Sequence, residues 1–146
     1  MLVLLGSTSG FSFELNEDLL GLPEVPYMVG QALSPEDVAA KRCVKTENGP
    51  TVCPIATAST RGFGFMIQET DGQARVTAVM SYWKCEPERC SAELKTTVEE
   101  LTKRLGAEPG RLGETPIWRD REKRHRDLVV QQLGSTMVSI VLLESD

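Results

Sequence analysis

Alternation of apolar and polar residues predicts several β-strands, most of them in the second half of the chain. A run rich in Phe and Ile is followed by the turn signal Asp71-Gly72 and then by a segment with apolar residues on both faces. Apolar residues on both faces are typical of a central strand. Gly134-Ser135 separates the last two of three apolar runs, which predicts a C-terminal meander. The predicted strands are residues 62–69, 75–84, 117–121, 126–133 and 136–143.

Helical periodicity is clearest in residues 87–105, where apolar residues recur on one face and Gly106 follows as a C-terminal cap. Charged residues lie off this face. A shorter helix is predicted for residues 34–41, because Ser34 is a good N-cap and Pro35 fits the first helical position. The apolar stripe of the long helix consists of Leu94, Val98, Leu101 and Leu105.

The four cysteines fall into two local pairs, Cys43 with Cys53 and Cys85 with Cys90. The first pair flanks an Asn-Gly turn signal, with valines at mirrored positions on either side, and the second lies just before the long helix. We therefore expect two disulfides, one closing a hairpin over residues 43–53 and one fixing the start of the long helix. A zinc site and four unpaired thiols remain alternatives, although the C-x2-C pairs usual for zinc are missing.

Together these elements predict an α+β fold. We expect an antiparallel sheet of about four to six strands packed by one long helix, with a short N-terminal helix and a disulfide hairpin. A chain of 146 residues corresponds to one domain, so residues 1–146 are assigned to it. Residues 1–28 form an acidic N-terminal arm. Residues 1–10 contain an apolar run followed by small residues, which fits either a leader remnant or a first strand.

The net charge of −5 comes from the N-terminal part of the chain, since residues 1–40 contain six acids and no Lys or Arg. Such an arm attracts basic partners and repels nucleic acid and anionic lipid, although it also promotes solubility alone. Disulfides form in oxidising compartments, so we expect a secreted or periplasmic protein made with a signal peptide. The chain has no apolar run of the roughly 20 residues that a membrane-spanning helix requires.

Residues 61–68 resemble the first RNP motif of RNA-recognition domains, with Phe63 and Phe65 in the positions of the aromatics that stack on bases. Gln68 replaces the last aromatic of the motif. A second predicted strand follows the motif, where the RNA-recognition order requires a helix. An RNA-binding domain is therefore a minor alternative, and the preferred interpretation is a packed strand that begins in a glycine-kinked turn.

No residues form a recognisable catalytic motif. Thr8 stands where a nucleophile elbow requires Ser, and no Gly-Lys-Ser/Thr phosphate loop follows. We therefore predict no enzyme activity, cofactor or metal. Residues 119–127 are dense in charge and lie beside a Trp, which fits either a polar contact surface or a solvated turn. The candidate partner-binding residues are Trp118, Arg119, Arg121, Arg124, His125, Arg126, Glu14, Glu17 and Asp18.

The order helix, hairpin, strand pair, long helix, meander resembles that of a broad group of small exported bacterial domains. This group includes the beta-lactamase inhibitor protein repeat and small outer-membrane assembly lipoproteins. The resemblance covers residues 29–143. It rests on a glycine leading to a Ser cap in residues 29–38, on Leu105-Gly106 with Pro109 after the long helix, and on Ile117-Trp118. The resemblance implies a protein that binds other proteins, as an inhibitor or an assembly factor.

These observations favour an exported protein-binding module. The leading hypothesis is a periplasmic inhibitor or immunity protein that neutralises a partner enzyme or toxin. A toxin or hydrolase encoded by an adjacent gene is one candidate for this partner. A structural or assembly component of the cell envelope is the second hypothesis. A carrier of a small ligand in the cleft between helix and sheet is the third, and it requires a pocket of roughly 300 Å³ or more.

Overall fold

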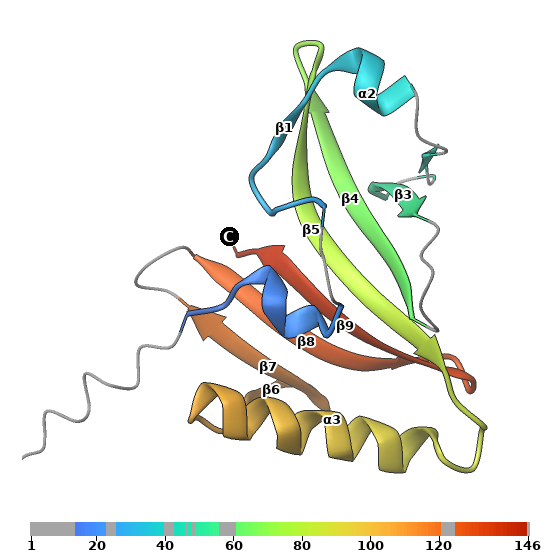
Figure 1. Ribbon diagram of the computed structural model, residues 1–146, viewed down its shortest axis with the longest axis vertical. Helices are drawn as coiled ribbons and strands as arrows, with labels where there is room; N and C mark the ends of the chain where they lie inside the picture. The colour runs from blue at the N-terminus through green and yellow to red at the C-terminus, as the bar shows by residue number, and fades with distance from the viewer. Residues whose placement is uncertain are drawn as a thin grey trace, which may run out of the picture.

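An antiparallel sheet dominates the computed structural model, which describes residues 14–22, 26–39, 43–45, 47, 49–55, 61–120 and 125–145. The sheet is twisted, and its strands run in the order β2-β3-β4-β5-β9-β8-β7-β6, with β1 paired to β5 (Figure 1). The strands in these residues are β1 Ala32–Leu33, β2 Val44–Lys45, β3 Thr51–Ile55, β4 Gly62–Thr70, β5 Gln73–Lys84, β6 Gly110–Leu112, β7 Thr115–Asp120, β8 Arg126–Leu133 and β9 Met137–Glu144.

Three helical segments accompany the sheet within the described residues. They are the 3-10 turn η2 Glu17–Leu20, the short helix α2 Pro35–Ala39 and the long helix α3 Cys90–Leu105. The side chain of Ser34 accepts a hydrogen bond from the backbone N–H of Asp37 at 3.1 Å, so α2 starts with the predicted N-cap. Gly106 ends α3 in the left-handed conformation, as its sequence position predicts.

The predicted sheet of about four to six strands is wrong, since nine strands join one sheet in the described residues. Two of the additional strands, β1 and β6, have only two and three residues, too few to show an alternating pattern. The hairpin of β2 and β3 was expected as a separate feature, but β3 pairs with β4 along its whole length and adds both strands to the sheet.

The five longer strands lie where the pattern predicts them, within one or two residues at each end. β5 pairs with β4 on one side and β9 on the other, so it is a central strand. β7, β8 and β9 form the expected meander. The long helix begins at Cys90, three residues later than predicted, because residues 86–89 form a turn before it.

One face of the sheet, here called the covered face, carries the core. Its central row crosses six strands, and every side chain in it is at most 1% exposed. The helix α3 packs on β8 and β9 at this face, and η2 packs on β5 and β9 (Figure 1). The hydroxyl of Ser81 donates to the carbonyl of Leu20 at 2.6 Å, which ties η2 to β5. The row consists of Cys53, Phe65, Val79, Leu142, Leu128 and Trp118.

The N-terminal arm is fixed to the covered face by a buried ion pair between Glu17 and Arg126. The guanidinium lies 3.2 Å from the carboxylate, and both side chains are 9% exposed. Arg126 also donates to the carbonyl of Val29 at 3.0 Å and to that of Leu15 at 3.4 Å. The carboxylate of Glu17 accepts a hydrogen bond from the backbone N–H of Val29 at 2.9 Å. Two stretches of the arm therefore converge on one residue of β8.

The structure contains both local disulfides, Cys43–Cys53 and Cys85–Cys90, and no described cysteine is free. In the first hairpin Val44 is directly opposite Val52, so the cysteines that flank this pair meet across it, as their mirrored spacing predicts. The second bridge joins the end of β5 to the first residue of α3. Each loop is short, so we expect each bridge to contribute about 2–3 kcal/mol.

The ion pair gives a first prediction. Replacing Glu17 with Ala removes the carboxylate that pairs with the buried Arg126 and should lower the free energy of unfolding by about 3–5 kcal/mol, as measured by urea denaturation. The matched control is Arg75→Ala, which breaks the exposed pair of Arg75 with Glu144; we expect a loss of at most about 1 kcal/mol there. Equal losses in the two variants would contradict the structural role of the buried pair.

A second prediction concerns the bridges. The mass of the intact protein should rise by about 4 Da on reduction, one hydrogen for each of four thiols, and a thiol reagent should label no cysteine before reduction. An unchanged mass would show that the thiols are free.

Candidate functional site

The opposite face of the sheet, here called the open face, is defined by the strand register. Side chains of residues that face each other across a ladder point to the same side. Two neighbouring rows can therefore be followed across the sheet. The central row runs through Pro54, Gly64, Met80, Val141, Val129, Ile117 and Gly110, and the second through Val44, Val52, Met66, Ala78, Leu143, Asp127 and Arg119.

The central row of the open face carries no charged or hydrogen-bonding side chain. The second row is apolar over its first five strands and ends in the charged pair Asp127 and Arg119. Among the described residues, the helices and the N-terminal arm pack on the covered face, which leaves Met66, Met80 and Val129 partly exposed. An antiparallel sheet with one face in water normally alternates with polar residues. An apolar centre with a polar margin is instead the anatomy of a protein interface.

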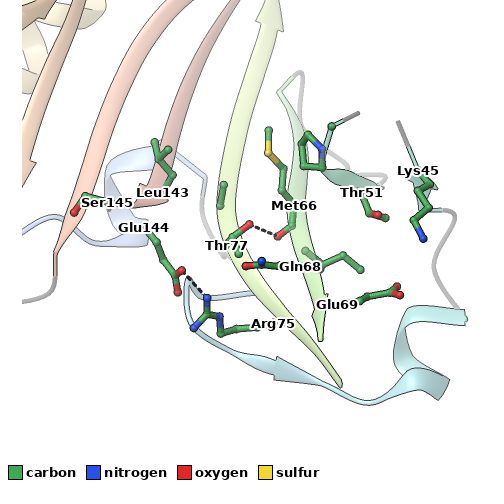
Figure 2. A pocket seen from close by; sticks show the side chains of 14 residues that line it. Lys45, Thr51, Met66, Gln68, Glu69, Arg75, Thr77, Leu143, Glu144 and Ser145 are labelled. Atoms are coloured by element: carbon green, nitrogen blue, oxygen red, sulfur yellow. Dashed lines mark hydrogen bonds and ion pairs between the residues drawn. The ribbon is translucent and has the colours of Figure 1, made fainter. Parts of the chain in front are cut away.

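A groove of about 620 Å³ lies at one end of the open face. Figure 2 shows Thr77 and Gln68 in its middle, with the end of β9 on one side and the β2–β3 hairpin on the other. The disulfide Cys43–Cys53 closes the base of that hairpin. A β-bulge between Met66 and Ile67 shifts the register of β4 and β5 at this point. The groove residues are Lys45, Gly49, Pro50, Thr51, Met66, Ile67, Gln68, Glu69, Arg75, Thr77, Ala78, Leu143, Glu144 and Ser145.

Charges of both signs surround the groove. Arg75 and Glu144 form an ion pair at 3.0 Å, with side chains 52% and 32% exposed, and Figure 2 shows them meeting at one end of the groove. Lys45 and Glu69 stand on the hairpin side. The hydroxyl of Thr77 donates to the carbonyl of Met66 at 3.4 Å, across the bulge. Two cations and two anions thus balance each other.

Three buried side-chain oxygens have no hydrogen-bond partner within the described residues, and all three belong to the open face. They are Oδ1 of Asp127, Oγ of Ser139 and Oγ of Ser145. Ser139 lies opposite Tyr82 and Gln131 and is completely buried. Unsatisfied buried polar atoms are uncommon in native proteins, where an ordered water, local strain or a functional role accounts for them. The covered face shows none in the part of the chain that is described.

A second hollow of about 500 Å³ lies at the other end of β5, lined by Arg61, Tyr82, Trp83, Lys84 and Met137 together with Gly62 and Glu93. The guanidinium of Arg61 lies 4.1 Å above the centre of the Trp83 ring and donates to the carbonyl of Leu20 at 3.0 Å. Burial lowers the pKa of Arg61, and the nearby Glu100 partly offsets this shift. The cation–π contact holds the Trp83 ring in place.

The glycines of the RNP-like segment have a packing role. A Cβ on Gly62 would collide with the ring of Tyr82, and one on Gly64 would touch the side chain of Met80 at 3.7 Å. Phe63 and Phe65, each next to one of these glycines, point to the covered face, where Phe65 stacks on Tyr27 with ring centres 4.3 Å apart. Phe63 and Phe65 are at most 1% exposed, so their rings cannot reach a base in this fold.

Three of the predicted partner-binding residues are buried in the free chain. Trp118 is 1% exposed, and its indole N–H donates to the carbonyl of Ala107 at 2.9 Å, behind α3. Glu17 and Arg126 form the buried ion pair. A partner therefore cannot contact these three side chains without unfolding part of the chain.

The other predicted residues lie apart from each other. Glu14 and Asp18 are exposed on the N-terminal arm, and Arg119 is exposed on the open face. His125 is exposed beside β8 in the left-handed conformation, and its carbonyl accepts the N–H of Ser145. Arg121 and Arg124 lie outside the described residues, so the structure says nothing of the charged tip.

Sequence reasoning missed the apolar side chains of the open face, above all Met80 and Val129. A signal for them was present, because residues 75–84 are apolar on both faces. That pattern was attributed only to a central strand. It also indicates that the second face has an apolar neighbour, which no described part of this chain supplies.

Neither a protein-family model nor a curated protein nor a solved structure is similar to this chain. Within the described residues, no helix is both long and apolar enough to cross a membrane, and no three residues of His, Cys, Asp or Glu are grouped to hold a metal. The case for a function therefore rests on the geometry of the open face.

The contact of Gly62 with Tyr82 gives a third prediction. Gly62→Ala should lower the free energy of unfolding, measured by urea denaturation, by about 1–3 kcal/mol. The added methyl group would force the Tyr82 ring out of its position against Gly62. Tyr82→Ala in the same chain should remove most of the penalty. Additive changes in the free energy of unfolding for the two substitutions would contradict the predicted contact between the Tyr82 ring and residue 62.

Proposed function

We propose that this protein is an exported protein-binding module, an inhibitor or immunity protein that neutralises a partner enzyme or toxin by docking the open face of its sheet against it. The observation that carries the proposal is the apolar central row of that face. It crosses seven strands without a polar side chain and has no covering element in the described chain. Met80 and Val129 in this row are partly exposed, while Val141 and Ile117 are 8% and 5% exposed. Apolar surface that no element covers marks interaction sites.

The size of the open face fits this function. At about 4.8 Å between strands and about 3.3 Å per residue, five strands and the length of β9 span roughly 600 Å² as a flat area. Projecting side chains increase the accessible area beyond this value. A standard protein interface buries about 800 Å² on each partner, so the face can supply one side of a stable complex.

The disulfides support the same function in two ways. They favour a secreted or periplasmic location, where bridges persist. They also fix two parts of the sheet that carries the open face, since Cys43–Cys53 closes the hairpin beside the groove and Cys85–Cys90 joins the end of β5 to α3. The backbone N–H of Cys85 donates to Thr136 at 2.8 Å and links this bridge to the start of β9. A face fixed in this way loses little conformational entropy on binding.

The second hollow offers a residue type that dominates interface energetics. Tyr82, of a kind enriched at hot spots, belongs to the open face because it lies opposite Gly62 and Ser139, whereas Trp83 lies opposite Val138 on the covered face. The acidic arm adds long-range attraction to a basic partner, which raises the rate of association. The resemblance to small exported domains that bind other proteins supports the same class of function.

Co-expression with the product of an adjacent gene, followed by size-exclusion chromatography, tests the proposal. We expect co-elution with the wild-type chain. Met80→Glu places a charge in the middle of the apolar row and should weaken the complex at least about 30-fold, the effect of losing a hot spot. Val129→Lys, two strands away in the same row, should act in the same way.

The matched control is Thr96→Glu, which adds the same charge at an exposed position of α3 on the other side of the molecule. It should leave the complex unchanged. Circular dichroism and the melting temperature verify that all three variants fold. A complex that survives both Met80→Glu and Val129→Lys would rule out the open face as the interface.

A further inference from the structure

The groove at the end of the open face (Figure 2) differs in chemistry from the apolar row beside it. Its middle carries two neutral hydrogen-bonding side chains, Gln68 and Thr77, and Ser145 lies at its β9 side. The hydroxyl of Ser145 is buried and has no partner in the described residues. Met66 and Leu143 belong both to the groove and to the second row, so the groove continues the open face without a break.

The charges of the groove select the kind of occupant. Lys45 and Arg75 are matched by Glu69 and Glu144. A polyanion such as a nucleic acid gains no net attraction from such a lining. A polypeptide segment carries amide groups that suit neutral hydrogen-bonding side chains, apolar side chains that suit Met66 and Leu143, and charges of either sign. The volume of about 620 Å³ lies in the range that buries a ligand of drug size, which is a few residues of extended chain.

The walls of the groove favour a segment in extended conformation. One wall is the hairpin of β2 and β3, whose base is closed by Cys43–Cys53, and the other is the end of β9. The floor between them is formed by β4 and β5, where the bulge at Met66 interrupts the regular ladder. A segment that enters from the open face would cross the floor from Leu143 toward Thr51.

We propose that this groove binds an extended loop or terminal segment of the partner protein, with an apolar side chain against Met66 and Leu143 and its backbone amides toward Gln68 and Thr77. The inference rests on the proposed function and deepens it. The apolar row supplies the broad contact with the partner, and the groove binds a short extended stretch of the partner's chain. Sequence preference would then come from the apolar wall and from the two charge pairs.

A phage-displayed library of random short peptides is the probe, selected on the full chain with its disulfides intact. We expect enrichment of peptides with an apolar residue flanked by charges. Gln68→Trp fills the groove from an exposed position of β4. It should lower the affinity for the enriched peptides by about tenfold or more. Gln68→Ala removes only the amide and should weaken them less. Amide signals of residues 68, 77 and 145 should shift in NMR titrations with the same peptides.

The matched control is Gln132→Trp, the same substitution at an exposed position of β8 outside the groove. It should leave peptide affinity unchanged within about twofold. The inference is overturned if no peptide enriches, if Gln68→Trp and Gln132→Trp bind the peptides equally, or if a single-stranded oligonucleotide occupies the groove instead.

The partner complex separates this inference from the proposed function. If Met80→Glu abolishes the complex while Gln68→Trp leaves it intact and no peptide enriches, the open face is the interface and the groove is not part of it. If both variants leave the complex intact, the partner binds elsewhere and this inference fails; if the wild-type chain forms no complex at all, the proposed function itself fails.

Discussion

The buried pair of Glu17 and Arg126 decides which face of the sheet is covered. A guanidinium on β8 can remain buried only if a carboxylate and several acceptors surround it, and here all of them come from the N-terminal arm. The arm is thereby held against the sheet, where Tyr27 stacks on Phe65 and Leu20 accepts the hydroxyl of Ser81. With the arm and α3 both on this side, no described element covers the apolar rows of the other side.

The arrangement separates stability from binding. The residues that hold the arm and α3 are buried on the covered face, so they contribute to folding and cannot be reached by a partner. The open face also has buried side chains, such as Ala78, Val141 and Ile117, and all its strands except the edge strands β2 and β6 are hydrogen-bonded on both sides. A face of this kind is consistent with the proposed docking of a partner protein by apolar contact.

Patterns confined to a few neighbouring residues could be interpreted correctly from the sequence. The Ser34 cap, the Gly106 cap and both disulfides follow from local spacing, since the interacting groups are close along the chain. The size of the sheet did not follow, because β1 and β6 are too short for a pattern and no Asn-Gly or Asp-Gly turn signal marks the connection from β3 to β4. The candidate site was mostly missed because its rows combine single residues from seven strands.

The sequence by itself determined the longer strands, the long helix and the two bridges, because hydrophobic period, caps and cysteine spacing act over a few residues. Only the tertiary structure decided what those strands face. It buried Trp118, Glu17 and Arg126, which the sequence had offered as contact residues, and it turned Phe63 and Phe65 inward while leaving Met80 and Val129 on the open face. Alternation along a strand tells which residues share a face. Which face is covered depends on how the arm and the helix cross the sheet, and that is a property of the whole chain.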